Sequence, residues 1–97
     1  MKVLALERDL PNANSEAFPH LAQDEARRVW DLHQAGLIRE MYFRADKNEA
    51  ILVLECESVM KAQEMLETLP YVQARLISFE FIPLKAYPGF ARLFEKI

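Results

Sequence analysis

The sequence predicts an α+β domain whose strands and helices follow the order β-α-β-β-α-β. Four short segments rich in branched and aromatic residues are separated by turn-forming residues, which is typical of strands. Two longer segments repeat their apolar residues with the 3.6-residue period of an amphipathic helix. The chain has 97 residues, 52% of them hydrophobic, and this is enough for one core. Residues 1–97 are therefore expected to form a single domain.

The first strand is expected over residues 2–8, which are short, mainly apolar and free of breakers. Turn-forming residues at positions 9–14 follow it and end the extended segment. A helix is then expected to begin between Ser15 and Pro19, because proline is tolerated in a first helical turn. This helix is expected to end near Ala35.

The second and third strands are expected at residues 37–44 and 50–55, with the polar residues 46–49 as their hairpin connection.

Ser58 suits the cap of a second helix whose apolar rhythm continues to Leu69, and Pro70 is expected to end that helix. The fourth strand is expected at residues 76–83.

Two helices set between four strands predict a ferredoxin-like split β-α-β arrangement with an antiparallel four-stranded sheet. Both helices are expected on one sheet face, because the crossovers are right-handed. A sheet with a solvated face alternates between apolar and polar residues, yet residues 51–54 and 77–82 carry apolar side chains on both faces. The second face is therefore expected to be covered by the same face of another copy. The alternative is that the C-terminal tail folds over it within one chain.

Charge and composition argue against several classes of protein. A net charge of −3 and the lack of a basic run argue against nucleic-acid binding. No apolar run reaches the roughly 18 residues of a membrane span, and no signal peptide is evident, so a cytoplasmic protein is expected. Cys56 is the single cysteine, and His20 and His33 do not form a ligand set, so no metal site is expected. With no phosphate loop and no nucleophile elbow, no cofactor is expected either.

Glu25 interrupts the apolar face of the first helix, where it falls between Leu21 and Val29. A carboxylate aimed at an apolar interior tends to have a raised pKa, which suits a general acid or base near neutral pH. Two alternatives stay open, namely a buried ion pair with a strand arginine and a side chain that leans out into solvent. His33 lies toward the edge of the same face.

The second strand carries Arg39, Tyr42 and Arg44. The guanidinium fork of an arginine matches the two oxygens of a substrate carboxylate. The alternative is a set of charge pairs across the sheet, and this is the stronger interpretation for Glu55 and Glu80.

Nearly the whole chain carries the pattern of a known family. A helix with Glu25 precedes Gly36-Leu37-Ile38-Arg39, a hairpin, an apolar strand and a second helix that closes in Thr68-Leu69-Pro70. Phe79-Glu80-Phe81-Ile82-Pro83-Leu84 and Tyr87-Pro88-Gly89-Phe90 follow near the end. In this pattern the sequence resembles the muconolactone isomerase family and its dimeric α/β-barrel relatives.

The resemblance implies a subunit that forms homodimers, or larger rings, with a pocket between sheet and helices. It also implies a cofactor-free isomerase that moves a proton on a small cyclic carboxylic acid or lactone. Glu25 would then transfer the proton and Arg39 would hold the substrate carboxylate, with His33, Tyr42 and Arg44 as substrate-binding residues. Two alternatives remain: a non-catalytic ligand-binding or assembly module, and a cofactor-free oxygenase of the same dimeric barrel.

Residues 84–97 form a tail that is unusually rich in large apolar side chains, among them Tyr87, Phe90, Leu93 and Phe94. Termini are usually disordered unless something ties them down. The tail is therefore expected to be an assembly arm that docks on a neighbouring subunit. The alternative is that it caps the pocket of its own chain.

Overall fold

The computed structural model describes residues 1–95, which form one four-stranded antiparallel sheet with helices on one face. The sheet order is β2-β3-β1-β4, so β3 lies between β1 and β2, and β1 lies between β3 and β4. The predicted α+β class and β-α-β-β-α-β order are confirmed. The elements are β1 (Lys2–Asp9), α1 (Ala17–Gln34), β2 (Ile38–Phe43), β3 (Ala50–Glu55), α2 (Val59–Leu66), α3 (Pro70–Gln73), β4 (Ile77–Leu84) and the 3₁₀ helix η1 (Gly89–Phe94).

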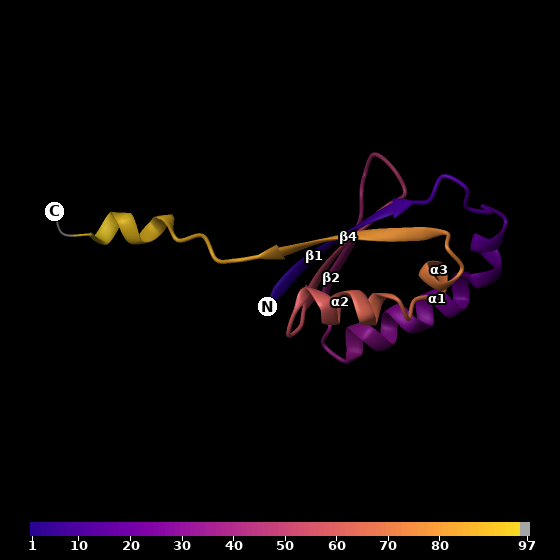
Figure 1. Ribbon diagram of the computed structural model, residues 1–97, viewed down its shortest axis with the longest axis horizontal. Helices are drawn as coiled ribbons and strands as arrows, with labels where there is room; N and C mark the ends of the chain where they lie inside the picture. Colours follow the sequence, from indigo (N-terminus) through magenta and orange to yellow (C-terminus); the bar gives the residue numbers. More distant parts are fainter. Residues whose placement is uncertain (96–97) are drawn as a thin grey trace.

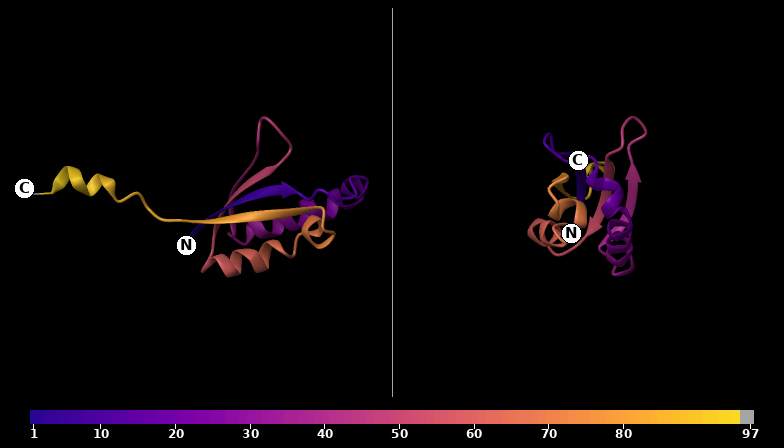
Figure 2. Two further views of the ribbon diagram at one scale, coloured as in Figure 1. Left: turned by 45° about the horizontal axis from the view of Figure 1, so that its top comes forward. Right: turned by 90° about the vertical axis from the view of Figure 1, so that its right-hand side faces the viewer.

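The helices α1 and α2 cover the same face of the sheet, and no helix of residues 1–95 lies on the opposite face (Figures 1 and 2). Each helix connects two strands that are parallel to each other and separated by one antiparallel strand, which is the split β-α-β connection. Within the described residues, no helix is long and apolar enough to cross a membrane.

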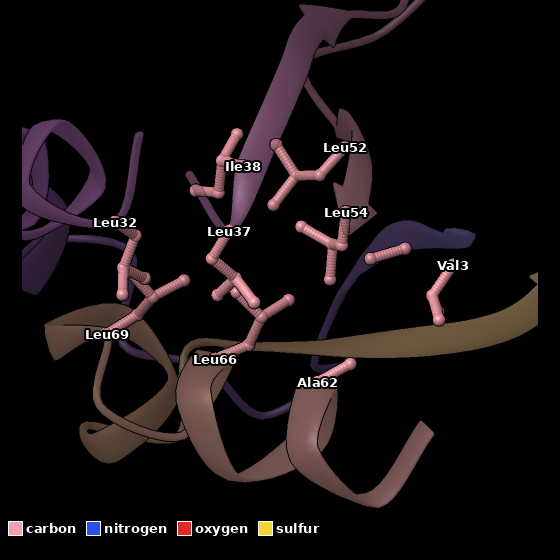
Figure 3. Close-up of a cluster of buried hydrophobic side chains, with 10 residues drawn as sticks. Val3, Leu32, Leu37, Ile38, Leu52, Leu54, Ala62, Leu66 and Leu69 are labelled. Carbon is pink, nitrogen blue, oxygen red and sulfur yellow. The ribbon is translucent and has the colours of Figure 1, made fainter. Parts of the chain in front are cut away.

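The core lies between α2, the C-terminal end of α1 and the sheet (Figure 3). Alternate residues of β1 face the helices, so Val3 is paired with Leu54 and Ala5 with Leu52 on the covered face. All four of these side chains are at most 5% exposed. The buried residues that meet them are Leu32 of α1, Ala62 and Leu66 of α2, and Leu69, which precedes α3.

The second helix corrects one sequence prediction, because it ends before Pro70, and Pro70 begins a further short helix. Helix α2 is capped by Ser58, whose side chain accepts a hydrogen bond from the Lys61 backbone N–H, and it ends at Leu66. A separate turn, α3, then starts with Pro70 at its first position. Proline suits that position because its ring fixes a helical φ and the first backbone N–H of a helix has no partner to lose.

Both edge strands of the sheet are irregular. Strand β2 shifts register between Ile38 and Glu40, so Arg39 is an extra residue relative to β3. At the opposite edge, β4 contains Pro83, which pairs with Val3 but has no backbone N–H to donate.

The face of the sheet away from the helices carries an apolar patch. Its members are only half-buried in a single chain: Leu4, Leu6, Ile51, Val53 and Ile82. The prediction of apolar side chains on both faces is therefore met. That a second copy covers this patch stays a prediction.

Residues 85–95 leave the body of the molecule as an extended arm that ends in η1, drawn in yellow in Figure 1. The Tyr87 ring meets the Phe90 ring edge-on, with centroids 5.1 Å apart, and it lies over Gly89, where a side chain would collide with it. The aromatic and aliphatic side chains of the arm are 67–82% exposed. The arm points away from its own subunit, and its docking on a neighbour stays a prediction.

Candidate functional site

A pocket of about 810 Å³ opens between α1 and the helix-covered face of the sheet. Most of its wall is hydrocarbon, and the charged side chains that line it are all acids. The side chains that line it are Glu7, Asp9, Phe18, Ala22, Glu25, Ala26, Val29, Trp30, Met41, Tyr42, Phe43, Asn48, Ala50, Leu52, Leu69, Tyr71 and Phe79.

Helix α1 shapes one wall through a single stripe of residues. Ala22 and Val29 lie on the same helical face as Glu25, at spacings of three and four residues. The small side chains of Ala22 and Ala26 leave room between the helix and the sheet. The pocket therefore exists because α1 places alanines, rather than leucines, at its midpoint.

Glu7 lies at the base of the pocket on β1, on the same strand face as Val3 and Ala5. It is only 8% exposed, and its Oε1 accepts a hydrogen bond of 3.3 Å from the Ala50 backbone N–H. Burial, reinforced by the neighbouring Asp9, raises the pKa of Glu7 from 4.5 to about 7. This carboxyl group is therefore divided between its neutral and charged forms near neutral pH.

Glu25 reaches the pocket from α1 and is half-buried. Its Oε1 accepts a hydrogen bond of 2.9 Å from the Tyr71 backbone N–H in α3. Burial raises the pKa of Glu25, and the hydrogen bond offsets part of that rise. Among residues 1–95, no lysine, arginine or histidine forms an ion pair with Glu25, so the alternative of a buried pair with a strand arginine is not what the structure contains.

Tyr71 lines the pocket and lies next to Glu25 and Phe18. Its ring meets Phe18 edge-on, with centroids 5.0 Å apart, and its hydroxyl donates to the Phe18 carbonyl at 3.3 Å. Burial raises the pKa of Tyr71, and the charges of Glu25 and Glu7 raise it further. Both acids are therefore electrostatic neighbours of this phenol.

The two predicted arginines are engaged elsewhere. The Arg39 Nε donates to the Gly36 carbonyl at 2.6 Å, and its side chain is exposed at the β2 bulge. Arg44 donates a bidentate pair of hydrogen bonds to the Asp46 carboxylate, at 2.8 and 2.6 Å. Neither arginine lines the pocket.

Of the two other predicted residues, Tyr42 lines the pocket and His33 does not. Tyr42 lines the pocket, and its hydroxyl donates to Glu40 at 2.8 Å, which raises the pKa of the phenol. The His33 Nδ1 lies 2.8 Å from the Ile38 carbonyl oxygen, and His33 does not line the pocket. The adjacent Trp30, which does line it, is tilted against the His33 ring at a centroid distance of 6.2 Å. Of the five predicted site residues, the pocket thus brings together Glu25 and Tyr42.

The β2 bulge explains part of this outcome. Regular alternation from Ile38 would place Glu40, Tyr42 and Arg44 on the helix side. Because of the extra residue, Met41 pairs with Leu52 and Phe43 pairs with Ala50, so Met41 and Phe43 take the helix side instead. The pocket wall is therefore more apolar than the regular strand would make it.

The cations nearest to the base of the pocket surround Glu49. Arg8, Arg44 and Lys47 approach the Glu49 Oε1 to 3.9, 3.8 and 3.2 Å. Burial alone would raise the pKa of Glu49, but Lys47 and Arg8 hold it below its ordinary value. These positive charges are paired beside the pocket and do not face into it.

Glu7 is the functional candidate that sequence reasoning missed. Strand alternation was the available signal, because it places Glu7 on the same face as Val3 and Ala5. Asp9, Tyr71 and the aromatic wall had no comparable local signal. In the part of the chain that the structure describes, no three histidine, cysteine or acidic side chains gather closely enough to hold a metal ion.

Comparisons with known proteins give one kind of match. No family model matches the chain, and no curated protein matches it. A solved structure is similar: 5-chloro-2-hydroxyhydroquinone dehydrochlorinase from Burkholderia phenoliruptrix, in complex with 2,5-dihydroxybenzoquinone. The TM-score is 0.64 at 17% identity, over 92% of this chain and 98% of that chain. The likeness shows that the two proteins share a fold.

Proposed function

We propose that this chain is an enzyme that moves a proton on a small cyclic compound, with Glu7 and Glu25 as its acid–base pair. The observation that carries the proposal is the presence of two carboxyl groups with raised pKa in one largely apolar pocket. Such groups are general acid and base candidates, because their pKa lies closer to neutral than that of an exposed carboxylate.

The chemistry is a proton shift between two ring positions. The ionised Glu25 takes a proton from a carbon beside a carbonyl, and the electron pair of the broken C–H bond moves into the ring as an enolate. The protonated Glu7 then delivers a proton to a second ring atom. Substrate and product have the same atoms, and the two carboxyl groups return to their starting states by exchanging protons with solvent.

Two further considerations support a small cyclic substrate. The resemblance to the muconolactone isomerase family implies lactone chemistry. The similar solved structure is that of an enzyme whose name gives a chlorinated hydroxyhydroquinone as its substrate. Arg39 stays outside the proposal, because its guanidinium is directed at Gly36 and not at the pocket.

The test is deuterium exchange in heavy water, which detects proton transfer without knowledge of the natural substrate. A panel of lactones, cyclic diones and dihydroxyarenes is incubated with the protein, and loss of activated ring protons is followed by NMR. We expect exchange with wild type for at least one compound, and loss of that exchange in Glu7→Gln and Glu25→Gln. Glu64→Gln is the matched control, because Glu64 is an exposed glutamate on α2 outside the pocket.

Exchange that survives in both pocket variants would remove Glu7 and Glu25 from the chemistry. Compounds that bind without any exchange would instead favour the non-catalytic ligand-binding alternative.

A further inference from the structure

We propose that this pocket selects its ligand by charge and shape, taking an uncharged flat ring and rejecting a carboxylate. This inference rests on the proposed function and names the substrate class of that site. It departs from the lactone acid that the family resemblance implies.

The charges that face the pocket are all acidic. Glu7, Asp9 and Glu25 line it, and no lysine, arginine or histidine of the described chain does. A carboxylate ligand would lose its hydration on entering the pocket, where these acids would repel it and no cation would pair with it. An anion is therefore disfavoured twice, through its own desolvation and through repulsion.

The cations close to the pocket already pair with acidic side chains, so they are not available to bind a ligand. Arg8 and Lys47 are paired with Glu49, and Arg44 is held by both Asp46 and Glu49. Redirecting any of them would remove one of the three cations that balance the charge of the buried Glu49, which is itself costly.

A cation is also a poorer match than a neutral ring. Most of the wall is hydrocarbon, and an ammonium ion would lose its hydration there. Glu7, with a pKa of about 7, is uncharged in about half of the molecules at neutral pH and offers only part of a counter-charge. A neutral hydroxyl group, by contrast, forms a hydrogen bond with either form of a carboxyl group, and a carbonyl oxygen accepts one from the protonated form.

The shape of the pocket favours a flat ligand. Ala22 and Ala26 of α1 face Leu52 and Phe79 of the sheet across the pocket, so small side chains oppose large ones. A planar ring would lie between the two walls with its polar edge toward Glu7 and Glu25. Aromatic neighbours such as Phe79 favour offset or edge-on contact with such a ring.

The test uses three probes of nearly the same shape: benzamide, benzoate and benzamidine, which are neutral, negative and positive near neutral pH. Binding is followed by the fluorescence of Trp30, the single tryptophan of the chain, which lines the pocket. We expect benzamide to bind about ten-fold more tightly than benzoate, and more tightly than benzamidine. In Glu25→Gln the preference for benzamide over benzoate should narrow by about three-fold, since one repelling charge is gone. Glu64→Gln should leave the preference unchanged.

Ala26→Leu tests the shape, because it fills the pocket while keeping a strong helix former in α1. It should weaken benzamide binding by about ten-fold or more, whereas Gln23→Leu, on the same helix outside the pocket, should not. Equal or tighter binding of benzoate, tighter binding of benzamidine, or no binding of any probe at millimolar concentration would overturn the inference. None of these probes has an activated ring proton, so this result is independent of the deuterium-exchange test.

Discussion

Replacing Glu7 with glutamine should change how the stability of the protein depends on pH. Glutamine has nearly the same shape and retains a carbonyl oxygen to accept the hydrogen bond from the Ala50 N–H, but it does not titrate. Glu7 is 8% exposed, so solvent screens its environment only weakly. The variant therefore isolates the free energy of ionising one buried carboxyl group.

The size and sign follow from the pKa of Glu7, which is about 7 in the folded protein against an ordinary value of 4.5. At about 1.4 kcal/mol for each pKa unit, ionising Glu7 costs the folded state about 3 kcal/mol. Between these two values the folded protein retains a proton that the unfolded chain has lost, so the free energy of unfolding falls as the pH rises. Below about pH 4.5 this loss is absent, and above about pH 7 it is complete.

The assay is urea denaturation at a series of pH values and one protein concentration. Glu7→Gln should remove about 3 kcal/mol of the decline that wild type shows between about pH 4.5 and pH 8, so the variant is the more stable protein at the alkaline end. Glu25→Gln is the comparison, because Glu25 also has a raised pKa and contributes in the same direction. Parallel profiles for wild type and Glu7→Gln would refute the assignment of a raised pKa to Glu7.

Three substitutions and one deletion test the fold and its assembly. Leu54→Ala should lower the free energy of unfolding by about 2–5 kcal/mol, because Leu54 is fully buried in the core and the cavity cannot fully collapse; a loss below about 1 kcal/mol in urea denaturation would contradict that packing. Ser58→Ala should cost about 0.5–2 kcal/mol by removing the cap of α2, and a helix content unchanged by circular dichroism with no loss of stability would show the cap to be dispensable. Val53→Asp places a charge on the outer sheet face and should lower the mass measured by light scattering if a second copy covers that face, whereas a monomer mass of 11.3 kDa in wild type would end that prediction. Deleting residues 85–97 should reduce the oligomer mass while the core stays folded; an unchanged mass with unchanged thermal stability would mean that the arm has no docking role.

Local sequence patterns predicted the elements of the fold well, because each is bounded by residues with strong local preferences. The third strand was predicted at residues 50–55 and is observed as Ala50–Glu55, since a polar hairpin precedes it and a helix cap follows it. Pro70 was predicted only to end a helix, because proline lacks an N–H and its ring clashes with the preceding turn, although its fixed φ also suits the start of a helix.

The site was harder to predict, because it depends on pairings between distant segments. The extra residue at Arg39 changes which side chains of β2 face the helices. No local pattern around residues 38–43 predicts that shift in register. Glu25 was found because a charge within a helical apolar stripe is conspicuous. Glu7 was not predicted because the first strand was treated as one short, mainly apolar segment, without asking which of its residues share a face. Glu7 shares its face with Val3 and Ala5.

The irregularities at the two edges of the sheet have a consequence for solubility. An open edge strand presents unpaired N–H and C=O groups that can recruit strands from other molecules and seed aggregates. In this chain the bulge at Arg39 breaks the regular spacing of those groups on β2, and Pro83 removes one donor from β4. Both features shorten the regular stretch of edge that could accept an added strand, which disfavours growth of this apolar-rich domain along its own sheet.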